Sequence, residues 1–107
     1  MDTQEYFKYI DNPHLIYEDE NSPKTVEELL SRIEAGERRF QGLTLQNQNL
    51  SNLNLSNLNL CGADLHGSDL TGCNLCNSTL HKAYLIGCDF SEANLPDCDL
   101  SEASLTQ

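Results

Sequence analysis

The chain has 107 residues, enough for one small domain, and its 38% hydrophobic and 7% aromatic content, with no Trp, would give only a thin conventional core. Seventeen acidic residues against six basic ones give a formal charge of −11, which disfavours binding to nucleic acid or to an anionic membrane. Because no apolar run resembles a membrane span or a secretory signal, we expect a cytoplasmic protein whose five cysteines are reduced.

Residues 1–24 are predicted to form an N-terminal extension that is both acidic and aromatic. Its content of Tyr, Phe, Ile and Leu is too high for a plain disordered tail. We expect its apolar residues to pack on the helix that follows or on a partner: Tyr6, Phe7, Tyr9, Ile10, Leu15, Ile16 and Tyr17.

A capping helix and its connection are predicted over residues 25–39. Thr25 and Glu28 have the spacing of a capping box, Ser22-Pro23 offers an alternative start one turn earlier, and Gly36 is a stop signal. We expect this helix to cap the domain that follows, because an end with open backbone edges needs covering. Its apolar face has i, i+3, i+4, i+7 spacing: Val26, Leu29, Leu30 and Ile33.

From residue 40 onward, an apolar residue recurs at every fifth position without a gap. On an α-helix, five residues turn by about 500°, which would scatter these side chains around the cylinder. On a continuous strand, odd spacing would place successive ones on opposite faces. The series is Phe40, Leu45, Leu50, Leu55, Leu60, Leu65, Leu70, Leu75, Leu80, Leu85, Phe90, Leu95, Leu100 and Leu105.

The residues between these positions indicate how the chain runs. Two positions before each Leu stands a second inward-compatible residue such as Ala63 or Cys73, and a polar residue such as Asp64 lies between the two. Each unit therefore has the in-out-in pattern of a short half-buried strand, and turn-prone pairs such as His66-Gly67 follow it. This alternation predicts a solenoid whose backbone hydrogen bonds join stacked coils.

Units such as Cys61-Gly62-Ala63-Asp64-Leu65 and Ser91-Glu92-Ala93-Asn94-Leu95 resemble the A(D/N)Lxx consensus of pentapeptide repeat proteins. The resemblance covers Phe40 to Leu105. It implies an all-β solenoid over residues 40–107: a right-handed quadrilateral parallel β-helix of about three coils with four repeats per coil.

The expected structural core consists of the inward apolar columns: Leu45, Leu50, Leu55, Leu60, Leu65, Leu70, Leu75, Leu80, Leu85, Phe90, Leu95 and Leu100. The first coil departs from the consensus with Gln48, Leu53 and Leu58 in place of Ala, and Tyr84 stands where Asp or Asn is expected. We expect Leu43, Leu53 and Leu58 to close the core beneath the helix.

The cysteines and histidines give no metal or redox site by their spacing. In the CxxC of Cys73 and Cys76, the register turns Cys73 inward and Cys76 toward solvent, so the thiols should diverge. The same register buries Cys88 and Cys98 and exposes Cys61. Cys61 and His81 would stack one coil apart, but structural zinc needs four ligands and only these two converge, with His14 and His66 elsewhere. We predict no metal and no cofactor.

The outward aspartates Asp64, Asp69, Asp89 and Asp99 are expected to contact nearby backbone at the coil edges. They would lie on a convex surface, whereas acid–base catalysis needs a desolvated concave site. The sequence has no Ser-His-Asp set, Gly-rich phosphate loop or HExxH motif. The chain is therefore predicted not to be an enzyme.

The leading functional hypothesis is a non-enzymatic protein-interaction or scaffold module with a protein partner. The alternative comes from the resemblance, because family members that confer fluoroquinolone resistance mimic duplex DNA and bind DNA gyrase. A prism about 16 Å tall would need about nine charges to match the charge spacing of DNA. The coil has seven acids spread over four faces.

The C-terminal coil is the expected association surface. The sequence stops at Gln107, so Leu95, Leu100 and Leu105 would be left open, and some members of the family dimerise through C-terminal coils. We expect a salt-promoted homodimer or the docking of a partner with basic residues. The acidic residues at this end form the expected interaction surface: Asp89, Glu92, Asp97, Asp99 and Glu102.

Overall fold

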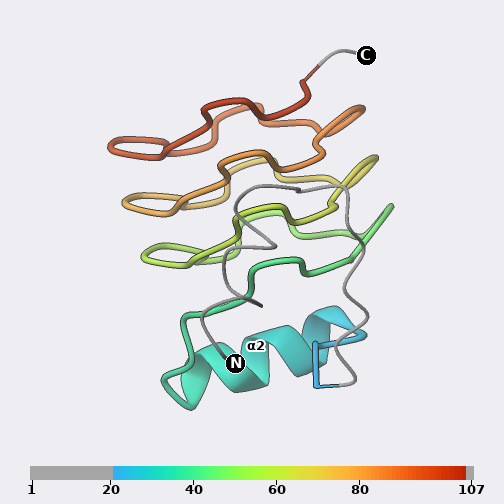
Figure 1. Cartoon of the computed structure of the whole chain (residues 1–107), viewed down its shortest axis with the longest axis vertical. Coiled ribbons are helices and arrows are strands. Elements are labelled where there is room, and N and C mark those ends of the chain that lie inside the picture. The colour runs from blue at the N-terminus through green and yellow to red at the C-terminus, as the bar shows by residue number, and fades with distance from the viewer. Residues whose placement is uncertain (1–20, 106–107) are drawn as a thin grey trace, which may run out of the picture.

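The computed structural model describes residues 21–105, so most of the predicted 1–24 extension lies outside the described residues. The described part contains one helix, α2 (Val26–Glu34), and a coiled segment in which backbone pairing is confined to single-residue bridges, rather than the three-residue strands suggested by the repeat. Figure 1 shows α2 at one end and the coils stacked on it in chain order.

The start of α2 follows the predicted capping signal with one change. The Thr25 backbone is extended, and its side-chain oxygen accepts the N–H of Glu28 at 3.1 Å. The Glu28 carboxylate accepts the N–H of Lys24 at 2.8 Å. In a standard capping box the Glu28 carboxylate would bind the N–H of the N-cap, Thr25; here it binds the N–H of the preceding residue, Lys24.

The end of α2 is a Schellman motif. Gly36, at φ +101°, donates its N–H to the Ile33 carbonyl at 2.9 Å, and Glu37 donates its N–H to the Arg32 carbonyl at 3.0 Å. A left-handed residue is required at this point, and glycine adopts that conformation without a steric penalty. The predicted stop at Gly36 therefore marks the end of the helix.

Coil stacking repeats with a spacing of 20 residues, which is four five-residue units and gives the coil four sides. The same three backbone bonds recur between stacked units. Leu45 donates its N–H to the Asp64 carbonyl at 3.0 Å, Asn47 donates to His66 at 2.9 Å, and Asp64 donates back to Leu43 at 2.8 Å. All the bridges are parallel, as the solenoid prediction requires.

Each corner is a tight turn. Ala63, for example, donates its N–H to the Leu60 carbonyl at 3.0 Å, and the intervening Gly62 has φ +70°. A positive φ at the third turn residue is typical of a type II β-turn. Non-glycine residues occupy that position at eight corners: Asn47, Asn52, Asn57, Asn77, Lys82, Glu92, Asp97 and Glu102.

The four sides are named here by their outward-facing middle residues, which stack in columns. The first wall has residues 44, 64, 84 and 104; the second has 49, 69 and 89; the third has 54, 74 and 94; and the fourth has 59, 79 and 99.

The core runs along the axis of the coils. Leu29 of α2 joins it, with Val26 and Ile33 packed against it, whereas Leu30 is half-buried outside this cluster. The apolar helix face is therefore narrower than predicted. Phe90, Leu95 and Leu100 pack against the core and are half-buried. The buried column residues are Phe40, Leu45, Leu50, Leu55, Leu60, Leu65, Leu70, Leu75, Leu80 and Leu85.

Three inward side chains of the second coil replace turn hydrogen bonds of the first. The buried Ser78 hydroxyl donates to the Leu55 carbonyl at 2.6 Å and accepts the Leu58 N–H at 3.0 Å. Ser68 makes the equivalent pair of bonds with the Leu45 carbonyl and the Gln48 N–H. The Cys73 thiol donates to the Leu50 carbonyl. These bridged turns lie in the first coil, where larger residues replace Ala.

Those larger residues do not all point inward. Leu43 and Leu58 are buried, Leu53 is half-buried, and Gln48 is exposed. Gln48 extends along the coil edge and donates its side-chain N–H to the Gln46 carbonyl at 2.9 Å. The departure from Ala at Gln48 therefore places a polar side chain outside the core, where its amide finds a hydrogen-bond partner.

Candidate functional site

The outward Asp and Asn side chains serve the turns. In most units, the residue before the inward Leu accepts the N–H of the residue after it, as Asp64 does from His66 at 3.2 Å and Asn74 does from Cys76 at 3.0 Å. This N–H is not used by the inter-coil bonds, so a short side-chain acceptor satisfies it. The consensus Asp or Asn therefore has a structural role.

Two of these carboxylates have a pKa below the ordinary value for Asp. Hydrogen bonds from the Ser91 hydroxyl and backbone lower the pKa of Asp89, and equivalent bonds from Ser101 lower the pKa of Asp99. Both side chains are exposed. They therefore contribute fixed negative charge to the surface.

Tyr84 and Pro96 are informative exceptions to this turn pattern. Pro96 has no N–H, so Asn94 is released from the turn and donates instead to the Asn74 side chain at 3.4 Å. The Tyr84 side chain does not accept the N–H of Ile86, which has no hydrogen-bond partner within residues 21–105. Tyr84 therefore departs from the turn pattern of most other units.

Cys61 and His81 lie at the same corner of successive coils. His81 directs its ring toward the next coil, with Nδ1 2.7 Å from Ser101 Oγ and Nε2 3.8 Å from the Glu102 carboxylate. In the part of the chain that the structure describes, no three His, Cys, Asp or Glu residues gather to hold a metal ion. His66 lies at a different corner, and His14 is outside the described residues.

For three of the cysteines, the solvent exposure in the structure differs from the predicted exposure. Cys61 is buried, at 7% exposure, because two further coils stack over its corner, and this burial raises the pKa of its thiol. Cys88 and Cys98 are half-buried, because no described residue stacks above them. Cys73 is buried and Cys76 is half-exposed.

The last described coil has a partly uncovered apolar face, which we call the end face: Phe90, Leu95, Leu100 and Leu105. The first three are half-buried and Leu105 is 50% exposed. Their backbone ladder is also open, because the N–H groups of Phe90, Leu95 and Leu100 have no partner among the described residues. At the opposite end, α2 packs on the first coil.

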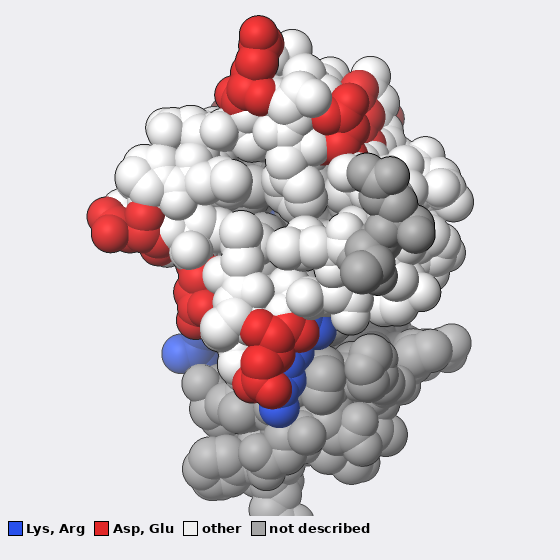
Figure 2. All heavy atoms as spheres, turned by 90° about the horizontal axis from the view of Figure 1, so that it is seen from above, with Lys and Arg blue, Asp and Glu red and all other residues white. Residues whose placement is uncertain are grey.

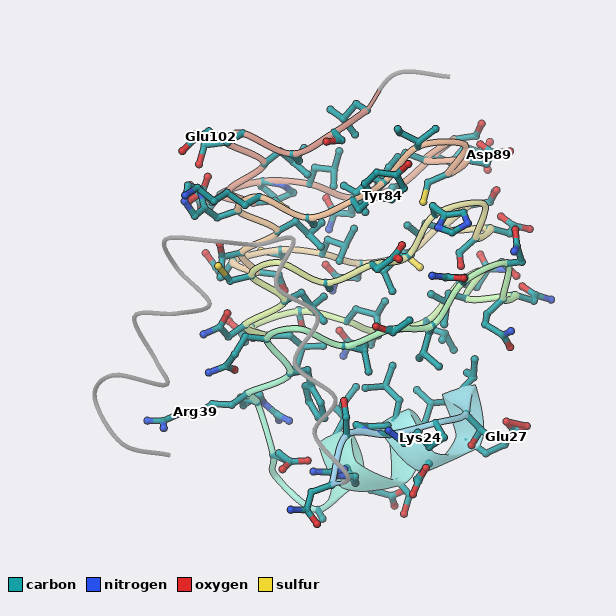
Figure 3. The ribbon with its side chains drawn as sticks, turned by 45° about the vertical axis from the view of Figure 1, so that its right-hand side comes forward. Lys24, Glu27, Arg39, Tyr84, Asp89 and Glu102 are labelled. Atoms are coloured by element: carbon teal, nitrogen blue, oxygen red, sulfur yellow. The ribbon has the colours of Figure 1, made fainter. Side chains whose placement is uncertain are left out.

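Acidic side chains surround the end face. Seen from above in Figure 2, the carboxylates form separate patches around the margin, and the centre is uncharged. Figure 3 shows Asp89 and Glu102 on opposite sides of the upper coils, whereas Lys24 and Arg39 lie toward the helical end. The predicted interaction residues are all exposed: Asp89, Glu92, Asp97, Asp99 and Glu102.

These features define a repeat protein: a four-sided parallel β-helix with a helix packed against its first coil. The family model of pentapeptide repeats, in eight copies, matches residues 39–75 and 68–107. The chain belongs to the pentapeptide repeat family. Membership of this family, together with the 20-residue parallel pairing, confirms the predicted right-handed quadrilateral β-helix.

Solved structures of cyanobacterial pentapeptide repeat proteins are similar to the chain. Alr5209 from Nostoc PCC 7120 is 33% identical, over 76% of this chain and 75% of that one, with a TM-score of 0.45. HetL from Nostoc sp. strain PCC 7120, involved in heterocyst differentiation regulation, is 38% identical over 78% and 38%, with a TM-score of 0.48. Rfr23 from Cyanothece 51142 is 28% identical over 64% and 53%, with a TM-score of 0.33.

The search of curated proteins gave no match. Within residues 21–105, no helix has the length and hydrophobicity needed to cross a membrane.

Proposed function

We propose that this chain is a non-enzymatic protein-interaction module that binds a partner protein through its end face. The observation that carries the proposal is the difference between the two ends of the coil. One end is packed against α2, whereas the other presents half-exposed apolar side chains beside backbone N–H groups that have no partner among residues 21–105. Apolar surface and open strand edges together favour docking of a protein.

The charge around the end face indicates the chemistry of the partner. The five acidic residues there are exposed, and the lowered pKa values of Asp89 and Asp99 keep two of them ionised well below neutral pH. The acidic residues around the end face attract a partner with basic residues around an apolar centre, and this attraction accelerates the encounter. A second copy of this chain would bring like charges together, so that association would need salt.

The arrangement of the acids gives no specific support to the DNA-mimic alternative. Acidic residues of the coil lie on the first, second and fourth walls and at three corners, whereas the third wall carries only Asn54, Asn74 and Asn94. Duplex DNA presents closely spaced phosphates continuously along its length. Scattered carboxylates match a basic protein surface better than they match that pattern.

The test begins with the full chain as bait in native lysate, followed by purification of each captured protein and calorimetry. The Leu105→Asp variant places a charge on the end face at an exposed position and should weaken binding at least tenfold. Asn54→Asp is the control, because it adds the same charge on the third wall, where Asp can still accept the Ser56 N–H. We expect the control to bind as the wild type does.

Light scattering of the purified chain at low and high salt distinguishes the two kinds of occupant. A dimer that increases with salt and is lost in Leu105→Asp would identify the partner as a second copy. A monomer under both conditions is expected for a basic heterologous partner. If, in addition, every captured protein bound Leu105→Asp as tightly as wild type, the end face would not be the docking surface.

A further inference from the structure

A second surface feature lies on the side of the coil, away from the end face. Five residues on the first wall and its following corner make up what we call the lateral patch: Gln46, Asp64, His66, Tyr84 and Ile86. They come from three successive coils, because residues 46, 66 and 86 occupy the same corner and residues 64 and 84 are a bridge pair.

The lateral patch is held in place by specific contacts. The Gln46 side chain donates to Asp64 Oδ2 at 2.6 Å, and His66 Nδ1 lies 2.9 Å from Asp64 Oδ1. The rings of His66 and Tyr84 meet edge to face, with centroids 5.5 Å apart and an interplanar angle of 85°. Such a contact fixes both rings without the rotamer freedom of isolated surface residues.

The fold does not account for Tyr84. An Asp or Asn at this position would accept the N–H of Ile86, as Asp64 accepts that of His66 one coil below. With Tyr84, this N–H and the Tyr84 hydroxyl both lack a partner within the described residues. A residue that violates a local structural rule without a compensating bond is where a functional role is expected.

The patch offers a ligand aromatic surface together with polar groups. The contact of His66 Nδ1 with Asp64 Oδ1 leaves Nε2 as the ring nitrogen available to a ligand. The Tyr84 ring offers a π-face, and its hydroxyl can accept a hydrogen bond. Asp69 and Asp89 add negative charge from the adjoining wall, and the one base of the coil, Lys82, lies at the far corner of the first wall.

We propose that the lateral patch binds an arginine side chain of a partner protein. A guanidinium combines a planar cation that stacks on an aromatic ring with several N–H donors in fixed directions. It therefore matches an aromatic face beside a phenol oxygen in a negative field. Lysine has the same charge but lacks the planar group, so the patch should distinguish between the two.

The probe is an acetylated and amidated Gly-Arg-Gly peptide, titrated into the full chain and followed by NMR. We expect saturable shifts of the Tyr84 ring, the His66 ring and the Ile86 amide, and a Kd at least threefold lower than for Gly-Lys-Gly. Tyr84→Phe keeps the ring and should retain most of the binding. Tyr84→Asn restores the family residue and should abolish the shifts at His66 and Ile86.

A purely structural role for Tyr84 predicts different results. Tyr84→Asn would then have a lower Tm than wild type, whereas we expect its Tm to be no lower, since Asn can cap the Ile86 N–H. Equal affinity for the arginine and lysine peptides, or shifts confined to Glu92, Asp97 and Glu102, would show general attraction to an acidic surface and overturn the proposal. Neither result depends on whether the end face binds a protein.

Discussion

At the scale of single residues, the choice of side chain depends on which backbone N–H and C=O groups the inter-coil hydrogen bonds leave without a partner. The outward Asp or Asn accepts a turn N–H at the edge, as Asp89 does from Ser91 at 2.9 Å, and an inward hydroxyl such as Ser78 bridges a turn in the coil below. The repeat consensus therefore records hydrogen-bonding needs as well as side-chain burial. Residues that fail these needs, of which Tyr84 is the clearest, are candidates for function.

Ser78→Ala should lower the free energy of unfolding by about 1–3 kcal/mol. The substitution leaves both the Leu55 carbonyl and the Leu58 N–H without the hydroxyl that now bridges them in the interior. Denaturant unfolding followed by circular dichroism measures the change. The matched control is Ser56→Ala, whose hydroxyl bonds to Asn54 at the surface and whose loss should change stability by less than about 0.5 kcal/mol.

The ionisation of Asp89 should affect stability only in acid. Its folded-state pKa is lowered, chiefly by the Ser91 hydroxyl, so the ionised form stabilises the fold above its ordinary pKa of 3.8. This contribution is lost as the pH falls through the lowered value. Ser91→Ala should raise the pKa of Asp89 toward the ordinary value in an NMR titration, while Asp99 titrates unchanged. An unchanged pKa of Asp89 would mean that the backbone bond alone is responsible.

The residue-scale features that the sequence predicted are those fixed by the five-residue period. Spacing alone distinguishes the inward Leu75 from the outward Asn74, because a side-chain alternation of two is imposed by the short strand segments. Spacing does not predict how much neighbouring coils cover a corner, so the burial of Cys61 was missed. It also cannot predict the contact of His66 with Tyr84, which depends on ring orientation.

At the scale of elements, α2 is the one regular helix within residues 21–105, and its attachment to the coil is both apolar and polar. Leu29 is buried in the core cluster, while the Arg32 guanidinium lies 5.9 Å from the centre of the Phe40 ring and 2.6 Å from the Glu37 carboxylate. The sequence predicted the helix because its caps and periodicity are local signals. It did not predict that Leu30 would lie outside the cluster, because that depends on the angle at which the helix meets the coil.

Leu29→Ala should destabilise the chain by about 2–5 kcal/mol, because the cavity forms where the helix and the first coil meet. Thermal unfolding of the full chain measures the loss. Leu30→Ala is the control on the same helix, and its smaller burial predicts a smaller effect. Equal losses in the two variants would contradict the packing described for α2.

At the scale of the whole molecule, protection from solvent decreases along the axis toward the last coil. The column residues are buried from Phe40 to Leu85 and half-buried from Phe90 to Leu100. The sequence predicted open side chains at Leu95, Leu100 and Leu105, but the equally regular repeat does not indicate that Phe90 is half-buried as well. The gradient arises because each coil is covered by the next, and Phe90, Leu95 and Leu100 have no described coil above them.

Thiol labelling should report this gradient directly. In the native chain, Cys73 and Cys61 should be modified slowest, because both are buried and their pKa values are raised chiefly by that burial. Cys76, on a half-exposed corner, should react fastest, with Cys88 and Cys98 between these extremes. Mass spectrometry of peptides from a time course distinguishes the sites. Rapid labelling of Cys61 would contradict the coil stacking at its corner.

The constant register between coils has a consequence for how the chain folds. Each inter-coil backbone bond joins residues 19 or 21 positions apart, as Leu45 to Asp64 and Asp64 to Leu43 show. The entropy lost in closing a loop grows only with the logarithm of its length, so each successive coil requires the same modest search. Folding can then propagate from one nucleated coil to the next. The time needed to add a coil should therefore be independent of how many coils are already in place.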